Sequence, residues 1–276
     1  MNLSELNFIE FDTYLLSQKS LIIHQVWFTN ICNRQQTQKL YSKLKMCRDS
    51  WDIHNSNLLH IIWNQERSLH LIKNFFPEYL DLYKNYSYEI QRCDFVRYCL
   101  LYRYGGIYVD MDYKCKKPFS MVFKKWNMYS IYFVESSHTC SISNSLMISY
   151  EKKHIFWKIL LMEIYKNSFT FKNFVDSSKH IDIIYTTGPG ILSKIYNIYK
   201  YRYKLGILPC ELFNPLNVKT SLYEINDKEN IYCIHYGLGS WESTDSKIII
   251  ELYKNYKILL FIIFIMLGPQ ILLNFV

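Results

Sequence analysis

Apolar and polar positions follow two alternating patterns in the first third of the chain, and these patterns predict strands and helices in turn. Residues 21–28 form a compact apolar run that predicts a buried strand, and residues 58–63 predict a second one. Between them, residues 34–48 are basic and polar enough for a surface helix. Residues 67–85 predict a further helix, interrupted at Pro77. This alternation predicts an α/β fold with a mostly parallel central sheet.

A longer helix is predicted next, between Ser87, which can cap its start, and Gly105-Gly106, which supply the positive φ that a helix end favours. Asp94 and Arg97 lie three residues apart, so both side chains leave this helix on one face. The apolar stripe consists of residues that recur at roughly helical spacing, namely Ile90, Cys93, Leu100, Leu101 and Tyr104.

A short strand is predicted directly after the two glycines. In it, three apolar residues alternate with three polar ones: Ile107, Val109 and Met111 with Tyr108, Asp110 and Asp112. Two carboxylates on one face of a strand end repel each other, and a bound divalent cation removes that cost. Oxygen ligands suit Mn²⁺ or Mg²⁺, which also bind phosphate oxygens. An exposed turn without a ligand is the alternative, but the helix, the glycines and the strand together favour a metal site at Asp110 and Asp112.

The second half of the chain continues the alternation. Residues 129–134 predict a strand, residues 141–149 a strand in their later half, and residues 156–165 a helix. In the segment 186–190, Thr-Thr-Gly-Pro-Gly, a proline and small residues precede an apolar helix at 191–199. This segment either shapes a wall of the site or is a simple turn.

Three motifs follow one another in the central stretch: Asp94-x-x-Arg97-Tyr98, Tyr104-Gly-Gly-Ile-Tyr108 and Asp110-x-Asp112. Their order and spacing resemble the sugar-transferase domain of glycosyltransferase family 32, which includes yeast-type mannosyltransferases, and more distantly the large glucosylating bacterial toxins. The resemblance extends more thinly from about Ile22 to Trp241. It implies a GT-A-like nucleotide-diphospho-sugar transferase fold. It also implies a metal-dependent, hexosyltransferase-type glycosyltransferase that acts with retention on an unknown glycan, lipid or protein acceptor.

The resemblance implies roles for the residues of these motifs. Asp110 and Asp112 would hold Mn²⁺ or Mg²⁺ on the donor diphosphate and would act together with Arg97 in catalysis. Arg97 would add a second positive charge or, paired with Asp94, position the sugar hydroxyls. Tyr108 lies on the same side of the predicted strand and would contact the nucleotide. No convincing nucleophile is apparent in the sequence.

Further donor contacts are implied outside this stretch. Trp27 ends an Ile-His-Gln-x-Trp pattern and would stack on the nucleotide base, although it also fits a core tryptophan at a strand end. Asn64, which follows a tryptophan, would contact the ribose or base, and Asn144 would hydrogen-bond the donor sugar. His24 and His154 are expected to serve local structure rather than to bind a ligand.

The last informative segment is residues 231–241, predicted as a strand that runs into a glycine-loosened turn. It carries His235, Ser240 and Trp241, and the family similarly ends its domain with a histidine followed by Ser-Trp. The resemblance implies that His235 completes the metal shell or touches the diphosphate, with Ser240 and Trp241 on the donor. A purely structural histidine is the alternative.

Composition narrows the function classes. A chain of 276 residues, half of them hydrophobic, suits one sizeable domain. The net charge of +8 favours acidic ligands such as nucleotide diphosphates or an anionic membrane face. Scattered lysines without a recognisable binding module argue against nucleic acid. The eight cysteines form no Cys-x-x-Cys pair, so we expect reduced thiols in an intracellular protein, without a zinc cluster or a signal peptide.

The C-terminal residues 258–276 form a run of 19 residues without a charge. A helix rising about 1.5 Å per residue would let this run cross a hydrocarbon core of about 30 Å. Gly268-Pro269 would kink it, and a helix buried in the protein or lying in the membrane interface is the alternative. Three lysines precede the run, so the positive-inside rule predicts a single C-terminal span with the catalytic domain in the cytosol.

The expected organisation is an N-terminal arm or helix at 1–20, a GT-A-like domain at 21–245 and a hydrophobic, membrane-anchoring segment at 246–276. Two other functions fit the same carboxylate pair. A metal-dependent phosphoesterase or nucleotidyltransferase would need further acidic ligands, and the sequence after residue 113 offers no obvious cluster. A non-catalytic nucleotide-sugar-binding protein of the same fold is the other alternative.

Overall fold

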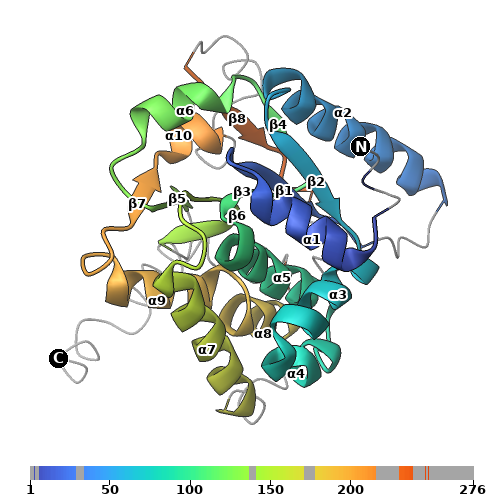
Figure 1. Cartoon of the computed structure of the whole chain (residues 1–276), viewed down its shortest axis with the longest axis vertical. Coiled ribbons are helices and arrows are strands. Elements are labelled where there is room, and N and C mark those ends of the chain that lie inside the picture. Colours follow the sequence, from blue (N-terminus) through green and yellow to red (C-terminus); the bar gives the residue numbers. More distant parts are fainter. Residues whose placement is uncertain are drawn as a thin grey trace, which may run out of the picture.

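The computed structural model describes residues 3, 6–28, 34–136, 141–170, 178–215, 230–238, 246 and 248, which form a layered α/β fold (Figure 1). A six-stranded sheet lies at its centre, in the order β2-β1-β3-β6-β5-β7. Its strands are β1 (Ile22–Val26), β2 (Leu59–Trp63), β3 (Gly106–Val109), β5 (Ile131–Glu135), β6 (Ile142–Ser149) and β7 (Gly206–Leu208). Among these strands only β6 runs against the others, which confirms the predicted mostly parallel α/β sheet.

The central strands β1 and β3 are buried along their whole length because other elements cover both faces of the sheet. Neither strand therefore alternates between buried and exposed residues, and even the polar His24 and Gln25 of β1 are buried. The polar His24 in β1 is fully hydrogen-bonded: its Nε2 lies 3.1 Å from the Gly105 carbonyl oxygen, and the Trp63 indole donates to its Nδ1 at 3.2 Å. Burial lowers the pKa of His24 to about 3, so the ring is neutral, and its predicted structural role is confirmed.

One face of the sheet packs against helices whose bounds are α1 (Phe8–Ser17), α3 (Gln65–Phe75), α5 (Glu89–Tyr104), α7 (Ile155–Thr170) and α9 (Pro189–Tyr199). The shorter η1 (Pro77–Tyr79), α4 (Leu80–Lys84) and α8 (Lys179–Thr186) lie at the rim of this layer. Helix α5 runs through the middle and is buried on almost every side, beyond the single stripe that its apolar residues predict. His154 supports α7 locally, since its Nδ1 accepts the Phe156 N–H at 3.2 Å.

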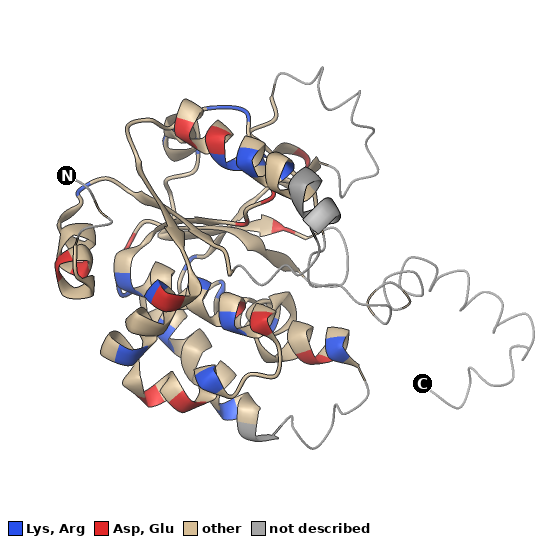
Figure 2. Cartoon of the chain, turned by 90° about the vertical axis from the view of Figure 1, so that its right-hand side faces the viewer, with Lys and Arg blue, Asp and Glu red and all other residues tan. Residues whose placement is uncertain are grey.

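The other face is covered by α2 (Arg34–His54), α6 (Phe119–Lys125), α10 (Cys210–Phe213) and a two-stranded sheet of β4 (Tyr113–Cys115) and β8 (Cys233–His235). The indole of Trp51 fastens α2 to β4, because its N–H donates to the Tyr113 carbonyl oxygen at 2.9 Å. Figure 2 shows that Lys, Arg, Asp and Glu lie mainly on the helices of the two outer layers, with few on the sheet between them.

Three local predictions need correction. Helix α5 begins at Glu89 and is not capped by Ser87, because the Gln91 side-chain oxygen accepts the Tyr88 N–H at 3.1 Å instead. Strand β3 ends at Val109 rather than continuing through Asp112, since the Tyr113 N–H donates to the Asp110 carbonyl oxygen at 3.2 Å and turns the chain. Strand β6 extends over almost the whole predicted segment rather than its later half.

The predicted membrane localisation also needs correction. Within the part of the chain that the structure describes, no helix has both the length and the apolarity of a membrane span. The run at 258–276, on which the single C-terminal span was predicted, lies outside the described residues. An uncharged run is not sufficient for a span, because a span also needs a continuous helix of about 20 residues that satisfies its own backbone.

Gly106 sets how closely β3 approaches β1. Its φ of +93° is a conformation that favours glycine, and a Cβ added there would lie 2.2 Å from the Ile22 carbonyl oxygen. No side chain fits between the two strands at this point. The glycine at the start of β3 is therefore required for the strand pairing that places the following residues.

We expect Gly106→Ala to lower the free energy of unfolding by about 2–4 kcal/mol, because it combines backbone strain with a backbone clash. Urea denaturation measures this loss. The matched control is Gly237→Ala, where φ is +55° but an added Cβ would meet nothing within 4 Å, so we expect a loss of about 1 kcal/mol. A loss for Gly106→Ala no larger than the control's would contradict the close approach of β3 and β1.

Candidate active site

The two aspartates of the Asp-x-Asp motif lie in the turn between β3 and β4, at the carboxyl end of β3. Because β1 and β3 are parallel, their carboxyl ends meet at the same edge of the sheet. The Asp110 N–H donates to the Ser145 carbonyl oxygen of β6 at 2.8 Å, which extends the β3–β6 ladder to the first aspartate. The sheet thus fixes the backbone at Asp110, and the turn brings Asp112 back beside it.

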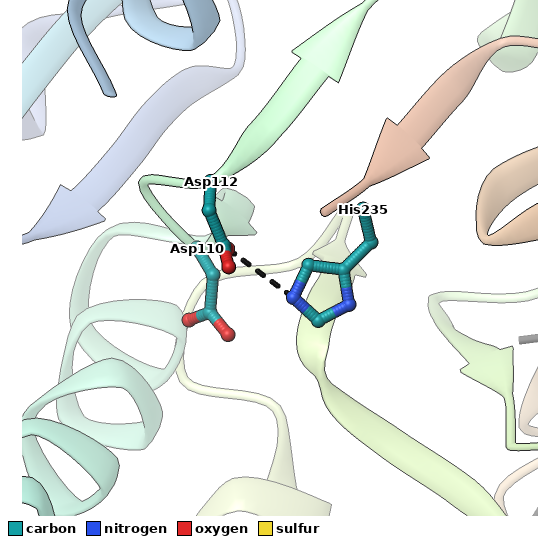
Figure 3. Close-up of side chains that lie close together, drawn as sticks. All are labelled: Asp110, Asp112 and His235. Atoms are coloured by element: carbon teal, nitrogen blue, oxygen red, sulfur yellow. Dashed lines mark ion pairs between the residues drawn. The ribbon is translucent and has the colours of Figure 1, made fainter. Parts of the chain in front are cut away.

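His235 reaches the aspartates from the end of β8. It lies opposite Tyr113 in the β4–β8 ladder, and the two rings stack with centroids 4.3 Å apart and planes 9° apart. The imidazole Nε2 lies 3.2 Å from Asp112 Oδ1. Figure 3 shows the imidazole beside the two carboxylates, although His235 is distant from both aspartates in the sequence.

Asp110, Asp112 and His235 form a candidate metal site. One ligand atom from each lies within 4.8 Å of the other two. Two carboxylate oxygens and one imidazole nitrogen are a donor set that suits Mn²⁺, and the two carboxylates also suit Mg²⁺. The residues that meet here therefore fit the divalent cation predicted from the sequence.

The charges of this group depend on one another. Burial raises the pKa of Asp112, but His235 and the Leu238 N–H, which donates to Asp112 Oδ2 at 2.8 Å, outweigh burial and hold that pKa below its usual value. Burial lowers the pKa of His235, but Asp112 and Asp110 outweigh it in the opposite direction. Without a metal, the histidine is therefore biased towards the protonated form, as the partner of Asp112.

The Asp110 carboxylate is held by Tyr108 and Arg97 rather than by His235. The Tyr108 hydroxyl donates to Asp110 Oδ1 at 2.7 Å, and Arg97 Nη1 lies 3.4 Å from the same oxygen. Burial raises the pKa of Asp110; Arg97 opposes this effect and Asp112 adds to it. Tyr108 thus orients one metal-ligand candidate through its hydroxyl, while its ring lies 4.6 Å below the Arg97 guanidinium.

Asp94 and Arg97 form a buried polar floor beside the aspartates, on the one face of α5 that their spacing predicts. Arg97 Nη2 lies 3.0 Å from Asp94 Oδ1, and Asn144 Nδ2 donates to the same oxygen at 3.0 Å. The Thr187 hydroxyl donates to Asp94 Oδ2 at 3.1 Å. Burial raises the pKa of Asp94 to about 6 despite its ion pair with Arg97. Among the described residues, the buried Arg97 Nε has no hydrogen-bond partner.

These side chains line a cavity of about 550 Å³. The cavity brings together most of the residues predicted from the sequence, namely Trp27, Asp94, Arg97, Tyr108, Asp110, Asp112, Asn144 and His235. Pro189, from the Thr-Thr-Gly-Pro-Gly segment, lines it too. Asn64 is not among the lining residues; its side chain caps α3 by accepting the Arg67 N–H at 2.8 Å. Ser240 and Trp241 lie outside the described residues.

The structure adds residues that the sequence reasoning did not single out. Ser143 and Ser145 of β6 line the cavity, and their hydroxyls lie 2.7 Å apart. The Tyr113 hydroxyl lies 2.9 Å from the Ser145 hydroxyl, so the ring that supports His235 is itself held from β6. The spacing of the two serines at i and i+2 in a predicted strand is the only sequence signal for them.

Comparison with known proteins identifies related enzymes. Residues 42–132 match the family described as glycosyltransferase sugar-binding region containing DXD motif. The chain is 28% identical over 245 residues to inositol phosphoceramide mannosyltransferase 3 of Schizosaccharomyces pombe. The matched region covers 88% of this chain and 62% of that protein. It is 29% identical over 180 residues to mannosyl phosphorylinositol ceramide synthase CSH1 of Saccharomyces cerevisiae. This matched region covers 65% of this chain and 43% of that protein.

The chain therefore spans less than two thirds of the length of these two curated relatives. Among solved structures, the PaToxG glycosyltransferase is 13% identical, covers 79% of this chain and 81% of that chain, and has a TM-score of 0.44. The family and the relatives found by sequence are glycosyltransferases, the enzyme class expected above. The resemblance expected from the sequence is thus confirmed: residues 42–132 match the model of the DXD-containing glycosyltransferase sugar-binding region.

Proposed function

We propose that this protein is a metal-dependent glycosyltransferase that transfers a sugar from a nucleotide-diphospho-sugar donor. The observation that carries the proposal is the meeting of Asp110, Asp112 and His235 in one cavity with the Asp94–Arg97 pair. The first three residues supply ligands for a cation that binds diphosphate. The last two supply donors and acceptors for sugar hydroxyls.

Each part of the donor has a matching part of the cavity. Asp110, Asp112 and His235 would hold Mn²⁺ or Mg²⁺, which neutralises charge that develops on the leaving nucleotide diphosphate. Arg97 lines the cavity and would place its positive charge near the donor diphosphate, beside Asp110. Asp94 and the Asn144 amide, already hydrogen-bonded to each other, present the polar surface on which sugar hydroxyls would lie.

The nucleoside is proposed to occupy the end of the cavity near the carboxyl end of β1. Trp27 lines the cavity there with its chain neighbours Val26 and Phe28, and Leu40 and Leu44 of α2 are also among the lining residues. A half-buried indole among apolar side chains provides a flat apolar surface for a base at low entropic cost. Ser240 and Trp241 are proposed as further donor contacts from the family resemblance alone, as are the contact of Asn64 and the retention of configuration.

For the acceptor, we propose a lipid that carries inositol phosphate, with mannose as the transferred sugar. The relatives are named for mannosyl transfer to inositol phosphoceramide. The cavity agrees with an amphiphilic acceptor, because Ile90, Ile183, Ile184 and Pro189 are also among its lining residues. These apolar side chains favour contact with a substrate that is not entirely polar.

A two-metal phosphoesterase or nucleotidyltransferase is less well supported. In the described ranges, a single group of His, Cys, Asp and Glu side chains has metal-binding geometry, and it contains three residues. Two-metal sites place ions about 3.5–4 Å apart and usually need further bridging carboxylates. A glycosyltransferase needs only one ion on its diphosphate, which fits the three ligands.

We expect Asp112→Asn to lower sugar transfer by on the order of 100-fold or more, because it removes a charged metal ligand where negative charge develops. The measurement uses nucleotide-diphospho-mannose, Mn²⁺ and an inositol phosphoceramide acceptor, with hydrolysis of the donor followed in parallel.

The matched control for this test is Asp81→Asn, which neutralises an exposed carboxylate on α4 and should leave the rate unchanged. Comparable thermal unfolding of both variants excludes a folding defect. Full activity of Asp112→Asn would contradict the metal role. Tight donor binding without turnover in the unmodified protein would support a non-catalytic binding protein, and phosphate-ester cleavage without sugar release would support the phosphoesterase.

We also expect Mn²⁺ to bind more tightly as the pH rises through neutrality. The two aspartates raise the pKa of His235 above its usual 6.5 despite its burial, and only the neutral imidazole binds a metal. Displacement of one proton lowers the Kd by at most about tenfold per pH unit below that pKa. The stability of the metal-free fold depends on pH in the opposite direction. The His235–Asp112 ion pair stabilises the fold below the His235 pKa, and this stabilisation is lost as the pH rises through that pKa.

Titration calorimetry with Mn²⁺ at several pH values between about 6 and about 8 measures this dependence. His235→Gln is the control, because its amide keeps a polar side chain that does not titrate in this range. We expect His235→Gln to bind Mn²⁺ more weakly than the unmodified protein does, and its affinity for Mn²⁺ to change less with pH. An unchanged slope in His235→Gln would show that another group releases the proton.

A further inference from the structure

Two free cysteines face each other beside the candidate metal site. Cys115 of β4 and Cys233 of β8 are direct partners in the antiparallel ladder, and both are fully buried. The Lys116 N–H donates to the Tyr232 carbonyl oxygen at 2.9 Å, which makes the neighbouring pair the hydrogen-bonded one. Cys115 and Cys233 therefore occupy a non-hydrogen-bonded position, where side chains come closest.

This position satisfies the backbone requirement for a disulfide. Residues opposite each other at a non-hydrogen-bonded site have Cα atoms about 4.5 Å apart, and disulfides span Cα distances of about 4.4–6.8 Å. The bond could thus form without moving either strand. None of the described ladders pairs two of the other four described cysteines, Cys47, Cys93, Cys99 and Cys210.

The surroundings of Cys115 favour its reaction. The Asn55 side-chain amide donates to Cys115 Sγ at 3.5 Å and would stabilise a thiolate there. Cys115 also lines a surface hollow of about 470 Å³ next to α2, together with Lys114, Lys45 and His54. The hollow gives an outside reagent a route towards this strand, and opening of a ladder of only three residue pairs would expose the sulfur.

The ladder that carries the two thiols also sets the metal site. Asp112 directly precedes β4, and His235 is the last residue of β8 (Figure 3). The pairing of Cys115 with Cys233 lies two positions along the same ladder from that of Tyr113 with His235. A covalent link between the two cysteines would therefore fix β8, and with it His235, against the strand that follows Asp112.

We propose that Cys115 and Cys233 form a reversible disulfide that locks the β4–β8 ladder and so holds His235 beside Asp112. The oxidant is a small disulfide such as oxidised glutathione. The Cys115 thiolate attacks one of its sulfurs and releases one glutathione thiolate; the Cys233 thiolate then attacks the mixed disulfide and releases the second. The protein loses two electrons and two protons, and one disulfide becomes two glutathione thiols.

The effect on metal binding rests on the proposed function, whereas the cross-link itself does not. The link closes a loop of roughly 120 residues, so it should stabilise the folded chain considerably by restricting the unfolded one. The oxidised protein is thus expected to keep its ligand group together under conditions in which the reduced protein loses it.

The test is to incubate the native full-length chain with oxidised glutathione, alkylate the remaining thiols, and map the peptides by mass spectrometry. We expect a peptide linked through Cys115 and Cys233, which dithiothreitol converts back to two alkylatable thiols. The midpoint of thermal unfolding should rise by about 5 °C or more in the oxidised protein. None of these readouts needs sugar transfer, so they separate this inference from the proposed function.

Two variants sharpen the test. Cys233→Ala should accumulate a glutathione adduct on Cys115, because no second thiol is left to displace it. The control Cys99→Ala removes another fully buried thiol and should still form the linked peptide. Thiols at 115 and 233 that both stay alkylatable in the native chain, links that join other cysteines instead, or an unchanged unfolding midpoint after linkage would overturn the proposal.

Discussion

The structure depends on the compensation of charge where β3 ends. Asp110 and Asp112 are brought together by a backbone turn at the carboxyl end of β3. Arg97 approaches Asp110 from α5, and His235 approaches Asp112 from β8. Each carboxylate thus has its own cationic neighbour. The space between the two remains for a cation that both can bind.

This arrangement explains why elements far apart in the sequence converge on one point. The β3 backbone is placed by the close approach of Gly106 to β1, and β6 continues the sheet on the other side through the Ser145 carbonyl oxygen. The same strand delivers the Asn144 amide to Asp94. The stacked pair of Tyr113 and His235 closes the group from the second sheet. Parallel strand ends, one antiparallel neighbour and one small ladder are therefore sufficient to build the site.

Local patterns in the sequence predict the parts of this site whose spacing is short. Asp94 and Arg97 are three positions apart in a helix, and this spacing alone predicts that they share a face. The double glycine and the alternation of the strand after it predict where Asp110 and Asp112 lie. Where the strand ends is less predictable, because β3 stops at Val109 through a hydrogen bond between Tyr113 and Asp110 that the alternation does not reveal. The contact of His235 with Asp112 depends on a ladder between distant segments, so only the family resemblance could suggest it. Asn64 shows the opposite case, since an asparagine before a helix has a local capping role regardless of the family pattern.

The charges of the cavity also determine how an anionic donor can enter it. A nucleotide diphosphate would meet Asp110 and Asp112, and their repulsion opposes its binding. Arg97 cannot offset this fully, because it lies within 3.0 Å of Asp94 and 3.4 Å of Asp110 and is largely neutralised by them. His235 is similarly occupied by Asp112. A divalent cation bound to the carboxylates makes the local charge positive, so that the same group of residues can bind a diphosphate. Metal binding should therefore precede or accompany donor binding at this sheet edge.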